Sequence, residues 1–205
     1  DGTITSVVSA NQAAGFSIVS YTGNNTNNAT VGTGLTVACD LVIVKDLTSS
    51  NYWCVGGSTV GNGENLYLND TGAKLTRDRV KSVQSNTFTL GNHGETNSTN
   101  NFIAYCFTSI SGYSKVGTYS GTGAAQTITT GFQPGFLMVK ATSHTSSWYI
   151  VDSARTPNYF LSPNSSAAEY TDSGKITFTS NGFTLGSTSY NNSGYTWIYL
   201  AIKEN

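Results

Sequence analysis

Apolar residues along this chain recur in short runs separated by turn-forming residues, without a helical period of about ten residues or more. Each run is rich in β-branched and aromatic residues and is bounded by Gly, Asn or Ser, which is typical of β-strands. The first half contains the runs Leu41–Lys45, Asn51–Val55, Leu66–Leu68, Thr87–Leu90 and Phe102–Phe107. The second half contains Phe136–Lys140, Ser147–Val151, Tyr159–Leu161, Phe183–Leu185 and Trp197–Ile202. The pattern predicts an all-β protein.

The two sets of runs match in order and spacing, which indicates a tandem duplication. The stretch GFSIVSYTG at residue 15 returns as GYSKVGTYSG at 112, and SNTFTLG at 85 returns as SNGFTLG at 180. Phe102 matches Trp197, and small insertions shift the offset near the start of each copy. The match covers nearly the whole chain from Gly15, so we expect the chain to contain two copies of one fold.

Six to eight short strands per copy, joined by Gly-rich turns, favour a β-sandwich of jelly-roll or immunoglobulin-like type. We predict two such repeats, 15–111 and 112–205, joined near Ser109–Tyr113 and preceded by an N-terminal strand and spacer at 1–14. In the second repeat, SNGF lies between Ile176–Thr179 and Phe183–Leu185. Asn-Gly there predicts a hairpin, because it supplies the positive φ angles of a tight turn.

The charge of the chain limits its partners. Of the 205 residues only 10% are charged, and the formal net charge is −1. The densest basic group, Lys74, Arg77, Arg79 and Lys81, is interpreted as a solvated turn, so no nucleic-acid partner is predicted. No apolar stretch approaches the roughly 20 residues of a membrane helix, so no membrane span is predicted.

The composition is typical of a secreted, extracellular chain with few charges and many Ser, Thr, Asn and Gly. Three cysteines, Cys39, Cys54 and Cys106, leave at least one unpaired within the chain. Buried free thiols are favoured, and one internal bridge stays open as the alternative. Asn-x-Ser/Thr sequons are as frequent as this composition produces by chance, so they mark surface loops only.

No catalytic, metal-binding or cofactor-binding pattern is found. His93 and His144 lie in Ser/Thr/Asn/Gly-rich loops, and neither adjoins a nucleophile in sequence. The segment DSAR, with Asp152 and Arg155, is interpreted as a local ion pair, and no Cys/His cluster or phosphate loop occurs. The sequence therefore predicts a non-enzymatic protein without a cofactor or a metal.

Two pairs of residues are retained in both copies and carry polar or aromatic chemistry. Trp53 and Trp148 are candidates for a surface platform that stacks on sugars, although a place in the core is favoured. Lys45 and Lys140 each follow a buried strand, and we expect each ammonium group to lie in water.

The stretches SVVSANQAAGFSIVSYTGN, GLTVACDLVIVKD and SGYSKVGTYSGTG resemble a family of tandem β-sandwich repeats in phage tail and other virion-associated proteins and in uncharacterised bacterial extracellular sequences. Cys39 stands where that pattern has Pro. The resemblance implies a structural or adhesive extracellular role and brings no catalytic residue with it. The chain also resembles, more weakly, pilus-like fibril subunits that assemble by donating an N-terminal strand.

The N-terminal strand raises a separate question, because Thr3–Ser9 has no evident partner next to it in sequence. It lacks the Lys or Pro that usually protects an exposed edge strand. Three interpretations are open: an edge strand of the first repeat, the end of a longer protein, or a strand donated to a neighbouring subunit. The donor interpretation is the one on which the functional prediction rests. Its strand residues are Ile4, Ser6, Val7, Val8 and Ala10, with Ile4 and Val8 pointing inward.

The predicted function is a non-enzymatic subunit of an extracellular, pilus-like filament, assembled from copies of itself head to tail by strand donation. A phage tail-fibre or receptor-binding module and a carbohydrate-binding surface module are the alternatives. The predicted partners are accordingly further copies of this chain and, in the alternatives, glycans or a cell surface.

Overall fold

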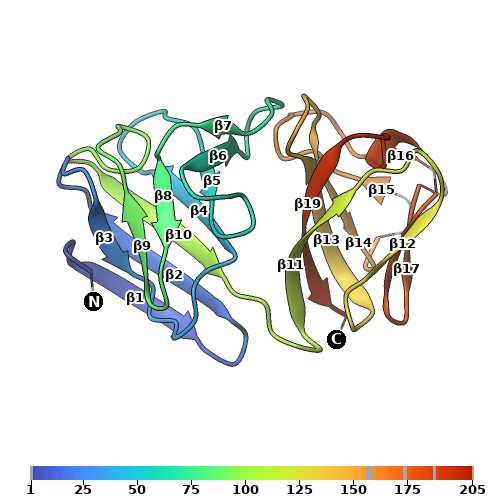
Figure 1. Cartoon of the computed structure of the whole chain (residues 1–205), viewed down its shortest axis with the longest axis horizontal. Helices are drawn as coiled ribbons and strands as arrows, with labels where there is room; N and C mark the ends of the chain where they lie inside the picture. The colour runs from blue at the N-terminus through green and yellow to red at the C-terminus, as the bar shows by residue number, and fades with distance from the viewer. Residues whose placement is uncertain (1, 156–158, 173–174, 187, 205) are drawn as a thin grey trace. The chain divides into compact units, whose positions relative to one another are not determined.

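The computed structural model describes residues 2–155, 159–172, 175–186 and 188–204. They divide into two compact units, which we call unit 1 (Asp1–Asp70 with Lys74–Ser109) and unit 2 (Thr71–Ala73 with Ile110–Asn205). Nearly all regular structure is antiparallel strand, apart from one 3₁₀ turn at Thr188–Tyr190 (Figure 1). The prediction of an all-β fold is confirmed.

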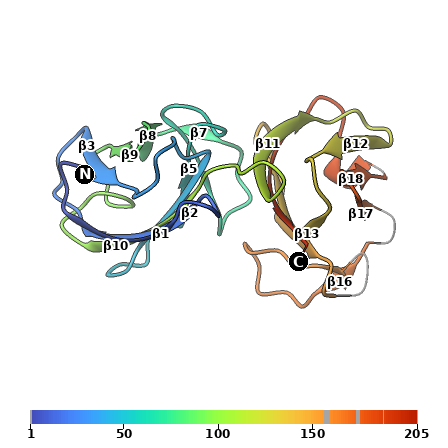
Figure 2. The ribbon, with the colours of Figure 1, turned by 90° about the horizontal axis from the view of Figure 1, so that it is seen from below.

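Unit 1 is built from two sheets that face each other across a core (Figure 2). The larger sheet has the order β1-β2-β10-β4-β5-β6-β7, and the smaller one has the order β3-β9-β8. The strands of the larger sheet are β1 (Ser6–Asn11), β2 (Phe16–Thr22), β10 (Asn101–Phe107), β4 (Leu41–Asp46), β5 (Cys54–Gly56), β6 (Glu64–Tyr67) and β7 (Leu75–Thr76). Those of the smaller sheet are β3 (Ala29–Gly32), β9 (Thr87–Leu90) and β8 (Val80–Val83).

Unit 2 repeats this arrangement, with sheets of order β11-β19-β13-β14 and β12-β18-β17 and a two-stranded pair β15-β16. The larger sheet consists of β11 (Ser114–Ser120), β19 (Thr196–Lys203), β13 (Pro134–Ala141) and β14 (Trp148–Asp152). The others are β12 (Gln126–Thr129), β18 (Gly182–Leu185), β17 (Ile176–Thr179), β15 (Tyr159–Phe160) and β16 (Tyr170–Thr171). The order β2-β10-β4-β5 of unit 1 thus returns as β11-β19-β13-β14.

An aromatic cluster occupies the same place in the core of each unit. Tyr21 stacks on Phe102 at 5.3 Å between ring centroids and meets Phe88 edge-on at 6.2 Å. In unit 2, Tyr119 stacks on Trp197 at 5.9 Å and meets Phe183 edge-on at 6.3 Å. Both arrangements are among the favoured geometries of aromatic pairs. The duplicated residues therefore occupy equivalent positions in three dimensions.

One core position has residues of different size in the two units, and the residue opposite it compensates for the difference. Val19 lies opposite Ala104 in unit 1, whereas Gly117 lies opposite Tyr199 at the equivalent place in unit 2. A Cβ atom on Gly117 would lie 2.6 Å from the Tyr199 hydroxyl oxygen. The large ring of Tyr199 thus fills the space that Val19 fills in unit 1. The strand register thus shows which residues of β2 and β11 are equivalent.

Two local predictions can be compared with the structure. The hairpin β17-β18 is present, but Thr179 pairs with Gly182, so the turn residues are Ser180 and Asn181. Gly182 is instead required because a Cβ atom there would lie 2.0 Å from the carbonyl oxygen of Ile128. Cys39, Cys54 and Cys106 are buried free thiols, as favoured. Burial raises the pKa of the Cys54 thiol, which makes it unreactive.

The compensation between Gly117 and Tyr199 predicts that substitutions at these two positions have non-additive effects on the stability of unit 2. Gly117→Val alone should destabilise unit 2 by about 1–3 kcal/mol through overpacking. Tyr199→Ala alone should cost about 3–5 kcal/mol, the usual range for a large aromatic core residue. The double variant should be more stable than the sum of the two losses predicts, because Val fills the space that Tyr199 leaves. Urea unfolding of all four proteins measures this, and strict additivity would contradict the equivalence.

Candidate functional site

The N-terminal strand is bound within its own unit. β1 pairs antiparallel with β2 over its full length, from Ser6 opposite Tyr21 to Asn11 opposite Phe16. Upstream of β1, the Ile4 amide nitrogen donates to Thr30 O at 2.9 Å, and the Ile4 side chain is 5% exposed in the core of unit 1. The segment thus joins the edge of one sheet to β3 of the other.

The prediction that this strand is donated to another subunit is wrong for this structure. Ile4 packs within its own core, and Val8 lies against Gly34, where an added Cβ atom would meet the Val8 methyl at 2.5 Å. A short turn fixes the hairpin: the Gln12 side chain donates to Gly34 O, and Ala14 N donates to Asn11 Oδ1 at 3.1 Å. The spacer is long enough to reverse the chain, so β1 closes locally, as in the edge-strand alternative.

The side chains predicted for the donor strand point to the two faces of the sheet, and some of its backbone groups lie along the sheet's free edge. Val7 is 75% exposed on the outer face of the sheet, whereas Ser6 and Val8 face β3 and the loop that follows it. Because Ile4 N–H points away from β2, the backbone groups of Ser6, Val8 and Ala10 point the same way. No hydrogen bond joins those backbone groups to another segment in the part of the chain that the structure describes.

A groove follows this free edge of β1. It has a volume of about 400 Å³ and is lined by Gly2, Ile4, Thr5, Ser6, Val8, Gly32 and Gly34. The groove therefore lies beside strand backbone that has no hydrogen-bond partner among the described residues. We call this groove and the free edge of β1 together the β1 edge.

The two candidate tryptophans differ in exposure. Trp53 is half-buried and stacks on Tyr105 at 6.5 Å, whereas Trp148 is 1% exposed. Both make the same backbone contact: Trp53 N donates to Asn69 Oδ1 at 2.9 Å, and Trp148 N donates to Asn164 Oδ1 at 2.7 Å. For Trp148 the structure supports the favoured core interpretation and excludes a surface platform.

The two lysines retained in both copies of the repeat donate hydrogen bonds to backbone carbonyls. Lys45 Nζ donates to Asp46 O at 2.7 Å, and Lys140 Nζ donates to Ala141 O at 2.6 Å. Lys140 is fully buried, so the expectation that its ammonium lies in water is wrong. A buried ammonium needs such oxygen partners, and the carbonyls of its own strand end and of Thr71 supply them.

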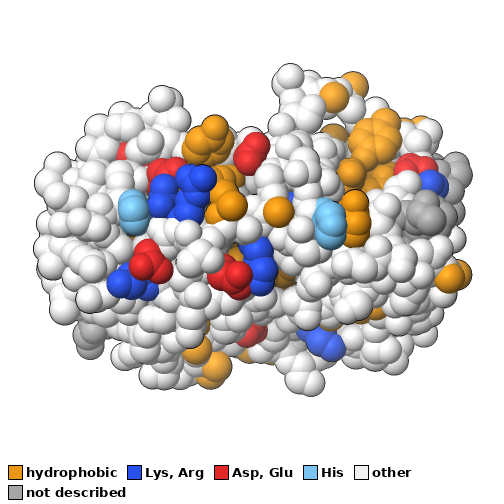
Figure 3. Space-filling model, turned by 45° about the horizontal axis from the view of Figure 1, so that its top comes forward, with side chains coloured by type: hydrophobic (Ala, Val, Ile, Leu, Met, Phe, Trp, Pro, Cys, Tyr) orange, Lys and Arg blue, Asp and Glu red, His pale blue; other side chains and the backbone are white. Residues whose placement is uncertain are grey.

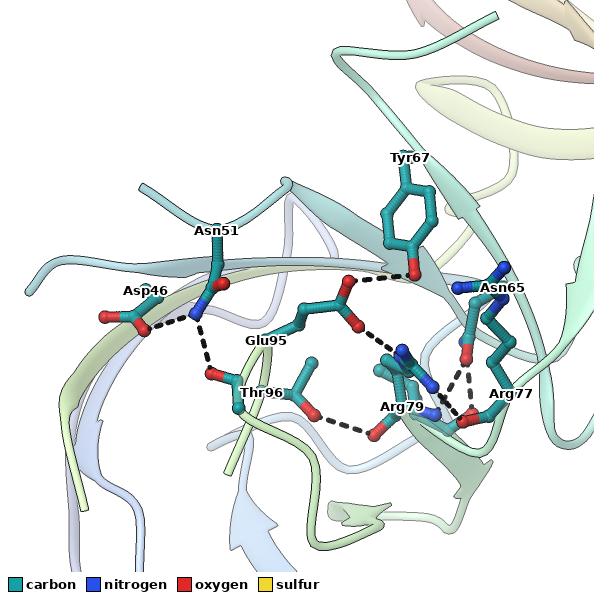
Figure 4. A network of polar contacts seen from close by, with 10 residues as sticks. Asp46, Asn51, Asn65, Tyr67, Arg77, Arg79, Glu95 and Thr96 are labelled. Carbon is teal, nitrogen blue, oxygen red and sulfur yellow. Dashed lines mark hydrogen bonds and ion pairs between the residues drawn. The ribbon is translucent and has the colours of Figure 1, made fainter. Parts of the chain in front are cut away.

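A polar network ties a long loop of unit 1 to its sheet (Figure 4). Glu95 accepts a hydrogen bond from Tyr67 Oη at 3.0 Å and forms an ion pair with Arg79. Burial alone would lower the pKa of Arg79, but the bond and the charge of Glu95 raise it. Burial and the same carboxylate raise the pKa of Tyr67. Glu95, Tyr67 and Arg79 are paired with one another, so none of the three is a free base or nucleophile. The network holds the loop that carries Glu95 against the sheet.

The same loop is held at its other side by Asp46. This carboxylate accepts hydrogen bonds from Asn100 Nδ2 and Asn51 Nδ2 and from the amides of Thr48 and Ser49, at 2.8–3.0 Å. Burial would raise the pKa of Asp46, but these four hydrogen bonds outweigh it and lower the pKa. Asp46 therefore acts as an acceptor at the end of β4 that organises two loops.

The candidate residue His144 makes contacts that stabilise the local structure. His144 stacks on Tyr195 at 3.7 Å, with Nδ1 2.9 Å from Ser143 Oγ.

The described residues contain no group of three or more side chains able to hold a metal ion. Among them, no helix is long and apolar enough to cross a membrane. On the face in Figure 3, acidic and basic side chains lie next to each other in small groups on a largely uncharged surface.

Comparison with known proteins places the chain in a family. The family model for the domain of unknown function DUF7483 matches residues 1–205. The chain belongs to this family. No curated protein and no solved structure gives a match to it. The match covers both units and β1.

The position of Ile4 in the core predicts that residues 1–11 stabilise unit 1. Ile4→Ala should lower the free energy of unfolding by about 2–5 kcal/mol, as for other buried isoleucines. Deleting residues 1–11 should lower the melting temperature, and a synthetic peptide of residues 2–12 should restore part of the loss. Val7→Ala, at an exposed position on the same strand, is the control. A deletion variant as stable as the parent would show that β1 is not part of the fold.

The hydrogen bonds to Asp46 predict a pH-dependent stability. Because the folded pKa is lowered, the stabilisation is present above the unfolded value of about 3.9 and is lost as the pH falls through the folded pKa. Asp46→Asn should therefore be less stable than the parent at about pH 7, and the difference should shrink on acidification. Urea unfolding at several pH values measures it. A difference that stays constant down to about pH 3 would contradict the assignment.

Proposed function

We propose that this DUF7483 protein is a non-enzymatic structural subunit of an extracellular filament that associates with further copies of itself through the β1 edge. The single observation behind the proposal is the unpaired backbone of Ser6, Val8 and Ala10 beside an open groove. Sheet edges of this kind bind extended chains by adding a strand, with main-chain hydrogen bonds supplying the affinity.

The residues along β1 favour an edge that pairs with another chain over an edge that is protected against pairing. Natural sheets protect their edges with Lys, Pro, bulges or very short strands. β1 has six residues, pairs with β2 in an unbroken register, and contains neither Lys nor Pro. Val7 adds an apolar side chain, 75% exposed, on the outer face of the same strand.

The symmetry of the contact decides what assembly results. If β1 paired with β1 of a second copy, the contact would be two-fold and would close as a dimer. Pairing of β1 with a different edge of the next copy leaves both ends open and continues head to tail. The filament proposal is of this second kind, and it differs from strand donation because β1 stays in its own unit.

The proposal predicts different effects for two neighbouring proline substitutions in β1. The Ala10 N–H points away from β2, so Ala10→Pro should leave the pairing with β2 intact and abolish assembly. The Ser9 N–H points to β2, so Ser9→Pro should instead lower the melting temperature of unit 1. Negative-stain images and size-exclusion chromatography measure assembly, and thermal unfolding measures the fold.

Each outcome of the imaging experiment favours one class of protein. Polymers that are lost in Ala10→Pro support the proposal. Closed dimers would mean β1-to-β1 pairing, discrete trimers would favour a tail-fibre module, and monomers at high concentration would favour a surface-binding module. Polymers that persist in Ala10→Pro would place the contact elsewhere and overturn the β1-edge proposal.

A further inference from the structure

The internal duplication allows one unit to serve as a reference for the other, and the two units differ at the end of one strand. The register pairs Val42 with Gly56 in unit 1 and Leu137 with Val151 in unit 2. Gly56 and the next residue, Gly57, therefore correspond to Val151 and Asp152. A pair of glycines has been replaced by a branched apolar residue and a carboxylate.

In unit 1 the two sheets are in close contact at this place. A Cβ atom on Gly56 would lie 2.6 Å from the Val80 Cβ of the opposing sheet, and one on Gly57 would lie 2.5 Å from Asp40 O. In unit 2, Ile176 takes the place of Val80, since both lie opposite the leucine that ends the central strand of the smaller sheet. The buried Val151 side chain therefore needs more space between the sheets than unit 1 has at Gly56, whereas the contact at Gly57 is with backbone beside β4 of the same sheet.

At the same place, unit 2 has a cavity. It has a volume of about 210 Å³ and lies between the end of β14 and the strand β17. Val151, Ile176 and Phe178 supply its apolar wall. The polar lining consists of Gln133, Asp152, Ser153, Arg155 and Thr177. The cavity is smaller than the roughly 300–1,000 Å³ of sites for drug-sized molecules, so it has room for one small ring.

The charged pair in the lining is fixed in place. Arg155 Nε donates to Asp152 Oδ2 at 2.8 Å, Arg155 N donates to Asp152 Oδ1 at 3.0 Å, and Arg155 Nη1 donates to Glu169 Oε2 at 3.1 Å. Burial would raise the pKa of Asp152, but the hydrogen bonds and charge of Arg155 lower it, so the pair stays ionised. Two carboxylates already neutralise the one guanidinium, which disfavours an anionic ligand.

The rest of the lining identifies the chemical class of the ligand. An amide, two hydroxyls and the ion pair offer both donors and acceptors. Phe178 and the aliphatic wall offer an apolar surface beside them. Neutral molecules with several hydroxyls and an apolar ring face satisfy both surfaces. We propose that this cavity of unit 2 binds one neutral sugar ring, such as the terminal residue of a glycan.

This inference does not depend on the filament proposal, because the cavity lies in unit 2 and the proposed assembly contact lies on β1. The unit 1 counterpart of Arg155 is Val60, which is 2% exposed, so a matching site is absent from the described residues of unit 1. The duplication would thus have produced one unit that contributes an edge for assembly and one that contributes a site for recognition.

The experiment uses the full chain, isotope-labelled, titrated separately with glucose, galactose, mannose, N-acetylglucosamine and inorganic phosphate. Binding of a sugar with a Kd in the millimolar range should shift amide resonances of Ser153, Thr177 and Phe178, and phosphate should leave them unchanged. Shifts caused by phosphate but by no sugar would mean an anion site. No shift with any of the sugars, or shifts spread over unit 1, would also overturn the proposal.

Two tryptophan substitutions separate loss of binding from loss of folding. Thr177→Trp should fill the mouth of the cavity and weaken sugar binding at least tenfold. Thr127→Trp is the matched control, because Thr127 and Thr177 both pair with Thr184 across the same sheet and only Thr177 lines the cavity. Both variants should keep the parent's spectrum elsewhere. Equal weakening in the two variants would contradict the assignment.

Discussion

In each unit one buried tyrosine connects three parts of the fold that would otherwise be held separately. Tyr21 stacks on the central strand β10 and contacts Phe88 of the opposing sheet, and its hydroxyl donates to Thr96 O at 2.7 Å. Tyr119 does the same with Trp197, Phe183 and Tyr190 O, again at 2.7 Å. A buried phenol needs a partner for its hydroxyl, so the ring cannot enter the core unless the loop closes over it. Core packing and loop position therefore form together.

The loops that the tyrosines fix are completed by buried amides. Asn97 Nδ2 donates to Thr26 O and Gly91 O at 2.9 Å, and Asn191 accepts from Thr122 N while its amide donates to Ala124 O. Both asparagines are fully buried. In unit 1, the Glu95–Arg79 pair and Asp46 add further contacts to the same loop. Low overall charge suits this design, because neutral amides and hydroxyls satisfy buried backbone groups without the desolvation cost of ions.

The units have diverged where the shared core does not constrain them. Unit 1 has an additional strand, β1, whose outer edge carries the proposed assembly contact. Unit 2 has Val151 and Asp152 in place of two glycines, and both residues line the cavity of the proposed sugar site. Gly117 and Tyr199 show the opposite situation, in which a change inside the core needed a compensating change in the facing strand. Duplication preserved the sheets and left their edges and ends free to acquire different contacts.

The sequence by itself determined the all-β class and the repeat, because alternating apolar runs and Gly-rich turns are local features that each copy carries in full. It also indicated that Phe102 matches Trp197. Tertiary structure alone decided where the N-terminal strand pairs, since a strand's partner depends on which edge lies within reach of its turn. It likewise decided the burial of Lys140 and the use of Gly182. The cavity beside Asp152 was also beyond sequence reasoning, which read Asp152 and Arg155 as a local pair. Its existence depends on the distance between two sheets, and that distance is set by side chains remote from each other in the chain.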